Sequence, residues 1–70
     1  MKEGEKMSIV ISLASARVNA ELTQKQVCEE LNISKTTLVN YEKGRTTPDI
    51  ETGKKLSKLY GIPINNIKFF

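Results

Sequence analysis

Residues 35–43, KTTLVNYEK, combine side chains that can hydrogen-bond to the edges of bases with the spacing of a short amphipathic helix. At about 100° per residue, Leu38, Tyr41 and Glu42 share one side of this helix, and polar side chains share the other. Thr and Asn can bond base edges in the major groove, where Asn can make two bonds to adenine and Val can touch a thymine methyl. The polar side comprises Lys35, Thr36, Asn40 and Lys43, with Thr37 on its flank and Val39 beside it. The solvated face of an ordinary surface helix has the same pattern.

The segment before this helix favours base contact in the major groove over an ordinary solvated face. Thr23 is a good N-cap, and Gln26 three residues later completes a capping-box pattern. Asn32 suits the left-handed conformation that ends a helix, and Ser34 is the N-cap of the next one. The apolar face of the helix in between consists of Val27, Cys28 and Leu31. Two short helices joined by a tight turn are how many proteins place the second helix in the major groove.

The remaining segments are expected to form the scaffold. Residues 9–19 read as a first helix, residues 49–60 as a fourth with Asp49 as N-cap and Gly61 as its end, and residues 64–67 as a short fifth after Pro63. We find no strand-like alternation, so we expect an all-α fold. Residues 1–6 are expected to form a flexible N-terminal tail and residues 7–70 one domain, with translation starting at Met1 or Met7. The expected core positions of the first and fourth helices are Ile9, Leu13, Ala16, Ile50, Leu56 and Leu59, with Val10 as a further candidate.

The run LTQKQVCEELNISKTTLVNYEKGRTTP resembles the lambda-repressor-like, or Cro/repressor-type, helix-turn-helix family over about residues 9–67. The family pattern is matched at Leu22, Thr23, Gln24, Ser34, Leu38, Tyr41, Glu42, Gly44 and Pro48. Cys28 stands where the family usually has Ala, and Asn32 where it usually has Gly. Cys28 is still a small residue suited to burial, and Asn32 still tolerates the backbone conformation of the turn. The resemblance implies a compact domain of five helices that binds double-stranded DNA.

The resemblance also implies roles for individual residues. Base contacts are expected from Lys35, Thr36, Thr37 and Asn40, and phosphate contacts from Gln24, Lys43 and Arg45. In the family an Arg of the first helix pairs with the Glu that closes the recognition helix, and Arg17 and Glu42 stand at these positions. A bidentate pair would lock the helices together. Two exposed charges worth little to stability are the alternative.

Charge and composition support nucleic acid as the partner and argue against catalysis. The net charge is +3, and residues 35–58 alone carry +3, although a solubilising surface could have the same charge. One Cys and no His exclude a disulfide framework or a zinc finger, and Cys28 is expected to be a packed structural thiol rather than a reactive one. Without a phosphate loop, catalytic acid pair or metal-ligand cluster, we expect no enzyme, cofactor or metal. Without a signal peptide or membrane span, we expect a cytoplasmic protein.

The expected function is sequence-specific transcriptional regulation, by a repressor of phage, prophage or mobile-element type. An antitoxin, or another protein-interaction module on the same fold, is the alternative. One recognition helix reads few base pairs, so we expect a homodimer on a pseudo-palindromic operator. The apolar C-terminal end could form the dimer seam, close the core or bind another protein; the seam residues would be Ile64, Ile67, Phe69 and Phe70.

Overall fold

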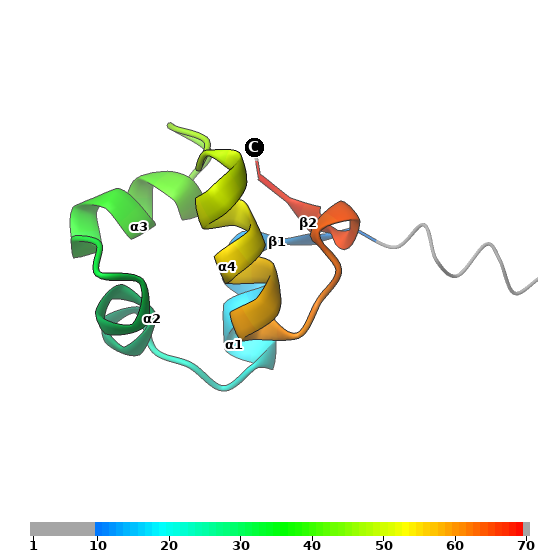
Figure 1. The fold of residues 1–70 in the computed structure, drawn as a ribbon, viewed down its shortest axis with the longest axis horizontal. Helices are drawn as coiled ribbons and strands as arrows, with labels where there is room; N and C mark the ends of the chain where they lie inside the picture. Colours follow the sequence, from blue (N-terminus) through cyan, green and yellow to red (C-terminus); the bar gives the residue numbers. More distant parts are fainter. Residues whose placement is uncertain (1–9, 70) are drawn as a thin grey trace, which may run out of the picture.

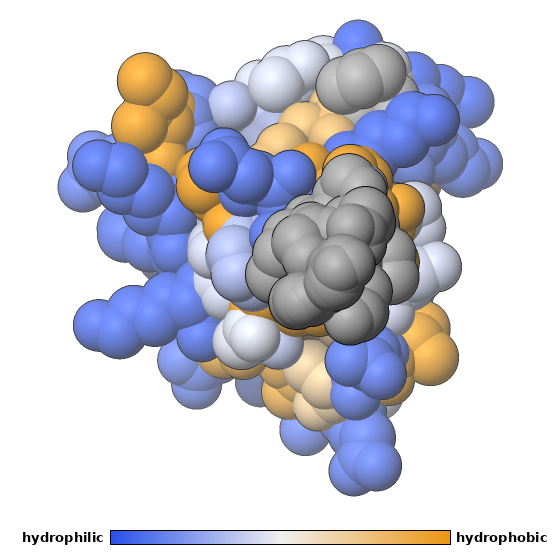
Figure 2. Space-filling model, turned by 90° about the vertical axis from the view of Figure 1, so that its right-hand side faces the viewer, coloured by the Kyte–Doolittle hydropathy of each residue, from blue (hydrophilic) through white to orange (hydrophobic). Residues whose placement is uncertain are grey.

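A computed structural model describes residues 10–69 of the chain, which form four α-helices, a 3-10 helix and two short strands. The elements follow one another as β1 (Ile11–Ser12), α1 (Leu13–Asn19), α2 (Gln24–Leu31), α3 (Lys35–Glu42), α4 (Ile50–Tyr60), η2 (Ile64–Asn66) and β2 (Ile67–Lys68). Helices α2 and α3 lie at one side of the molecule, the strand pair lies at the other, and α1 and α4 lie between them (Figure 1). The strand-bearing side shows small hydrophobic patches among hydrophilic side chains (Figure 2).

The expectation of five helices and no strands was wrong at both ends of the fold. The predicted fifth helix is the single 3-10 turn η2, because residue 67 already belongs to β2. The predicted first helix starts only at Leu13, since Ser12 caps it by accepting a hydrogen bond from Ser15 N at 3.1 Å. The two residues before Leu13 form β1, which pairs in parallel with β2 in the register Ile11 to Ile67. Ile9, which was expected in the first helix, lies outside the described residues.

The starts of α2, α3 and α4 are fixed by the side chains that the sequence indicates. Thr23 Oγ1 accepts from Gln26 N at 3.0 Å, and Thr23 N donates to Gln26 Oε1 at 2.8 Å, so the predicted capping box is confirmed. Ser34 and Asp49 each accept from the amide three residues further on, at 3.1 and 2.8 Å. Hydrogen bonds from the Thr52 side chain and backbone lower the pKa of Asp49. Asp49 therefore contributes its full stabilisation of α4 at pH values above the ordinary pKa of an aspartate. This contribution is lost as the pH falls through the lowered pKa of Asp49.

Left-handed residues end these helices and reverse the chain. Asn32 (φ 57°) and Gly61 (φ 70°) end α2 and α4 as predicted, and Gly44 (φ 73°) follows the end of α3. Glu21, between α1 and α2, has φ 61° and was not expected to adopt this conformation. The left-handed conformation costs conformational energy in any residue with a Cβ, and this cost is smaller for Asn than for most residues. Glu21 is therefore the most strained of these positions.

The core draws at least one side chain from each α-helix and from β2. Its fully or nearly fully buried members are Leu13, Ala16, Val27, Leu38, Leu56, Tyr60 and Ile67. Burying a side chain of the size of Leu or Ile contributes about 1.5–3 kcal/mol. Ile50, the first residue of α4, was expected in this core, and this was wrong: it is 75% exposed, although Pro48 and Gly53 on either side of it are buried. Leu59 is partly buried and packs against the core.

Replacing Glu21 with Gly should stabilise the domain. Gly adopts the left-handed conformation without the Cβ clash, so Glu21→Gly should raise the free energy of unfolding by about 0.5–1 kcal/mol in a urea titration. Asn32→Gly is the matched control and should gain less, because Asn already tolerates this conformation. A loss of stability in Glu21→Gly would show that the Glu side chain makes a contact worth more than the strain.

Removing the hydroxyl of Tyr60 should not destabilise the fold. The side chain is 5% exposed, and its hydroxyl is buried without a hydrogen-bond partner among the described residues. Burial raises the pKa of this phenol, and the nearby Glu42 carboxylate raises it further, so the phenol stays neutral. An unpaired buried hydroxyl costs about 1–3 kcal/mol. Tyr60→Phe should therefore unfold at the same or a higher urea concentration; a clear drop in the midpoint would mean that the hydroxyl has a partner.

Candidate nucleic-acid interface

Helix α3 is held by one buried residue and presents its polar side outward. Leu38 is completely buried, as the helical wheel predicts. Lys35 and Thr36 are exposed at the start of the helix, and Thr37 and Asn40 are half-buried. Side chains with hydrogen-bonding groups therefore reach the surface along one side of a short, fixed helix. This is the arrangement that direct reading of base edges requires.

The chain folds back on α3 at its C-terminal end. Arg45 N and Thr46 N both donate to Asn40 O, at 2.9 and 3.4 Å, after a left-handed turn at Gly44. Lys43 N donates to Val39 O at 2.9 Å, so this residue completes the last helical turn. The backbone of Arg45 therefore lies against the same turn that carries Asn40. The structure thus brings a candidate base contact and two exposed cationic candidates for phosphate to one end of α3.

The hydroxyl of Thr37 already has a partner within the protein. Thr37 Oγ1 and Ser34 Oγ lie 2.8 Å apart, and either can donate. Since Ser34 Oγ also accepts from Thr37 N, the pair is part of the cap of α3. A contact between Thr37 and DNA would have to use the remaining hydrogen-bonding capacity of this pair.

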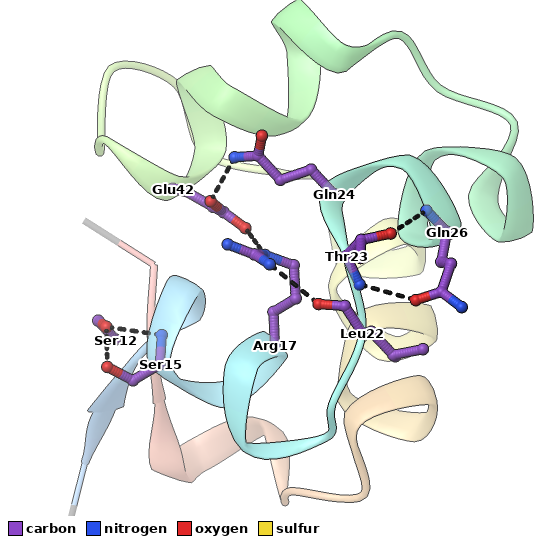
Figure 3. Close-up of polar contacts among 8 residues, drawn as sticks. All are labelled: Ser12, Ser15, Arg17, Leu22, Thr23, Gln24, Gln26 and Glu42. Carbon is purple, nitrogen blue, oxygen red and sulfur yellow. Dashed lines mark hydrogen bonds and ion pairs between the residues drawn. The ribbon is translucent and has the colours of Figure 1, made fainter.

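Three helices meet at the carboxylate of Glu42 (Figure 3). Arg17 Nε, from α1, donates to Glu42 Oε2 at 2.7 Å, and Gln24 Nε2, from α2, donates to Glu42 Oε1 at 3.0 Å. Arg17 Nη1 also donates to Leu22 O at 2.9 Å. The side chains of Arg17 and Glu42 are only 16% and 7% exposed. We call this set of four residues the Glu42 junction.

The Glu42 junction differs from the expected bidentate pair. Arg17 divides its guanidinium between a carboxylate oxygen and a backbone carbonyl, and Gln24 takes the second carboxylate oxygen. Leu22 N donates to Arg17 O at 3.2 Å, so both backbone polar groups of Leu22 are bonded to Arg17. Sequence reasoning missed both the carbonyl and the second role of Gln24, since residue types do not reveal backbone acceptors. The contact of Gln24 with a phosphate stays a prediction and would use its second amide hydrogen.

The residues named for a dimer seam occupy different environments. Ile67, for which closing the core was the alternative to the seam, is 5% exposed and fills the core from β2. Ile64 is 37% exposed, and Phe69 is partly buried against the core. Phe70 lies outside the described residues. The seam itself stays a prediction, now without Ile67.

Other candidate chemistry is sparse in the described part of the chain. Cys28 is a free, half-buried thiol that packs against the core. Between residues 10 and 69, no three His, Cys, Asp or Glu side chains cluster in a way that could hold a metal ion. In the same range, no helix has the length and apolar character needed to cross a membrane.

The fold and its family agree. The chain belongs to the helix-turn-helix family, whose model matches residues 13–67. It is 44% identical over 48 residues to the cryptic phage CTXphi transcriptional repressor RstR of Vibrio cholerae, covering 69% of this chain and 43% of RstR. It is 45% identical over 56 residues to the HTH-type transcriptional regulator ImmR of Bacillus subtilis, covering 80% of this chain and 44% of ImmR.

A third relative is a transcriptional activator, whereas RstR is a repressor. The HTH-type transcriptional activator BcrR of Enterococcus faecalis is 33% identical over 55 residues, covering 79% of this chain and 27% of BcrR. The chain spans less than half the length of each of these three relatives. No solved structure matches it.

Neutralising Glu42 should destabilise the fold through Arg17. Glu42→Gln keeps the shape of the side chain but leaves a largely buried guanidinium without its carboxylate. We expect a loss of about 1–3 kcal/mol in the free energy of unfolding, measured by urea titration. Gln24→Ala is the matched control, because it removes a neutral donor from the same carboxylate, and it should cost less than Glu42→Gln. Equal stability of Glu42→Gln and the unchanged protein would show that the pair behaves like an exposed one.

Proposed function

We propose that this protein is a sequence-specific DNA-binding transcriptional repressor of phage, prophage or mobile-element type, acting in the cytoplasm. The observation that carries the proposal is the outward polar side of α3, held from beneath by Leu38 and at its end by the Glu42 junction. Membership of the helix-turn-helix family supports DNA as the partner. The similarity to RstR, a phage transcriptional repressor, supports repression over activation.

The proposed contacts are of two kinds: contacts with base edges, which would read the sequence, and contacts with phosphates, which would hold the DNA in place. Base edges would be read by Lys35, Thr36 and Asn40, with Thr37 on either a base or the backbone. Phosphates would be held by the exposed cations Lys43 and Arg45 and by Gln24 at the start of α2. The net charge of +3 over residues 35–58 supports the holding role, because releasing phosphate counterions gives affinity without regard to sequence.

Two copies of the chain would be needed for a specific site. A single recognition helix covers too few base pairs to define an operator in a genome. Helix-turn-helix proteins solve this with two-fold dimers whose half-sites lie about one helical turn, roughly 34–36 Å, apart. We therefore propose a pseudo-palindromic operator occupied by a homodimer.

Selection of bound sequences from a random duplex pool tests the proposal directly. We expect an enriched site with two inverted half-sites, and affinity for it that falls steeply as salt rises. A protein-interaction module that does not use DNA would enrich no sequence and would show no salt-dependent binding to random duplex.

Substitutions on α3 and in the loop after it should separate reading from holding. Asn40→Ala should cost about 1–3 kcal/mol on the selected site and relax the preference at one base pair, with little effect on random duplex, since Asn carries no charge. Arg45→Ala should weaken both duplexes alike and reduce the salt slope by about one. Fluorescence anisotropy over a salt series would measure both. Equal losses on both duplexes for Asn40→Ala would place Asn40 on the DNA backbone instead.

A further inference from the structure

A groove with both apolar and charged side chains in its lining lies between α2 and α4. It has a volume of about 220 Å³ and is lined by Glu30 and Leu31 at the end of α2 and by Lys55, Lys58 and Leu59 in the second half of α4. We call it the α2–α4 groove. None of these five residues is among the proposed contacts with DNA, so the groove is independent of the function proposed above.

Two leucines supply the apolar part of this groove. Leu31 and Leu59 pack against the core but are only partly buried, so part of each side chain stays at the surface. Covering apolar surface of this kind with another apolar side chain is favourable, because it removes both surfaces from water. A charged phosphate backbone cannot cover the leucines in this way. The groove therefore suits an occupant that has apolar side chains.

Two cations stand on the α4 side of the groove. Lys55 and Lys58 are exposed and lie three residues apart, so they are neighbours on one face of the helix. Neither forms an ion pair with another residue between 10 and 69. Lys55 is partly balanced by Asp49, whose pKa it helps to lower, and the acid of the lining, Glu30, belongs to α2. The α4 side thus offers positive charge that no described carboxylate contacts directly.

We propose that the α2–α4 groove binds a short acidic segment of a partner protein, with an apolar side chain against Leu31 and Leu59 and carboxylates at Lys55 and Lys58. Charge complementarity decides the occupant, since carboxylates match the two lysines and an apolar side chain matches the two leucines. Nucleic acid would match only the lysines. Glu30 repels carboxylates from the α2 side, so the acidic part of the segment lies along α4.

Selection from a library of random displayed peptides against the full chain tests the proposal without a known partner. We expect enriched peptides that combine acidic residues with large apolar ones. Fluorescence anisotropy of a labelled enriched peptide then measures its affinity for the unchanged protein. The affinity should fall as salt rises, because exposed charges are screened, but the apolar contact should keep part of it.

Replacing both lysines of the groove should weaken the binding of this peptide. The double variant Lys55→Gln, Lys58→Gln removes two charges from exposed positions and should weaken binding about tenfold. Lys54→Gln is the matched control, because Lys54 is exposed on the same helix but does not line the groove. The control should bind the peptide like the unchanged protein, and all variants should keep the melting temperature.

Glu30→Gln should have the opposite effect on the same peptide. It removes the repelling carboxylate, so the affinity should rise about twofold. Glu29→Gln is its control, because Glu29 is the exposed neighbour that does not line the groove. An effect of a damaged fold would lower the affinity in every variant, whereas the groove predicts a fall on the α4 side and a rise on the α2 side.

The possible failures identify other occupants. The absence of an enriched peptide, or peptide binding that the double lysine variant leaves unchanged, would overturn the proposal. A lower salt slope on random duplex DNA in the double variant, but not in Lys54→Gln, would assign the lysines to DNA and overturn it as well. Self-association of the unchanged protein that the double variant loses would assign the groove to a second copy. Failure of the DNA selection described above would end the proposed function without touching this peptide site.

Discussion

The orientation of α3 depends on the carboxylate of Glu42. One oxygen accepts from Arg17 of α1 and the other from Gln24 of α2, so the last residue of α3 is tied to both preceding helices. The pair is largely buried, which makes the geometry of the hydrogen bonds more important than charge alone. Leu38 fixes the middle of the same helix from beneath. Because the inner side and the end of α3 are fixed, we expect the fold to tolerate substitutions of the outward-facing residues of this helix.

Local features of the chain could be predicted, and distant pairings could not. The caps at Thr23, Ser34 and Asp49 were predicted from residue type and position in the local sequence, and the structure confirms all three. The strand pair joins Ile11 to Ile67, and two-residue strands leave no alternating pattern to detect. The Leu22 carbonyl was missed as an acceptor of the Glu42 junction for the same reason: contacts between separate segments leave no local sequence pattern. It also explains why the sequence left the role of Ile67 open between a dimer seam and the core, since its pairing with Ile11 could not be predicted.

The sequence was least informative where the fold carries strain or leaves surface uncovered. Glu21 adopts a left-handed conformation that its residue type does not indicate, and it directly precedes Leu22, whose carbonyl accepts from Arg17. Ile50 was placed in the core by its spacing, yet it is 75% exposed. Such departures from local rules mark positions where another demand acts on the chain.

The most direct test of the account is an NMR titration of the ¹⁵N-labelled protein with the selected operator half-site. We expect the largest amide and side-chain shifts at Lys35, Thr36, Asn40 and the loop through Arg45, with smaller shifts at the start of α2. The side-chain amide of Asn40 should also show contacts with base protons of the major groove. Shifts confined to the C-terminal half of α4 or to the strand pair, with α3 unchanged, would contradict the central claim that α3 reads DNA.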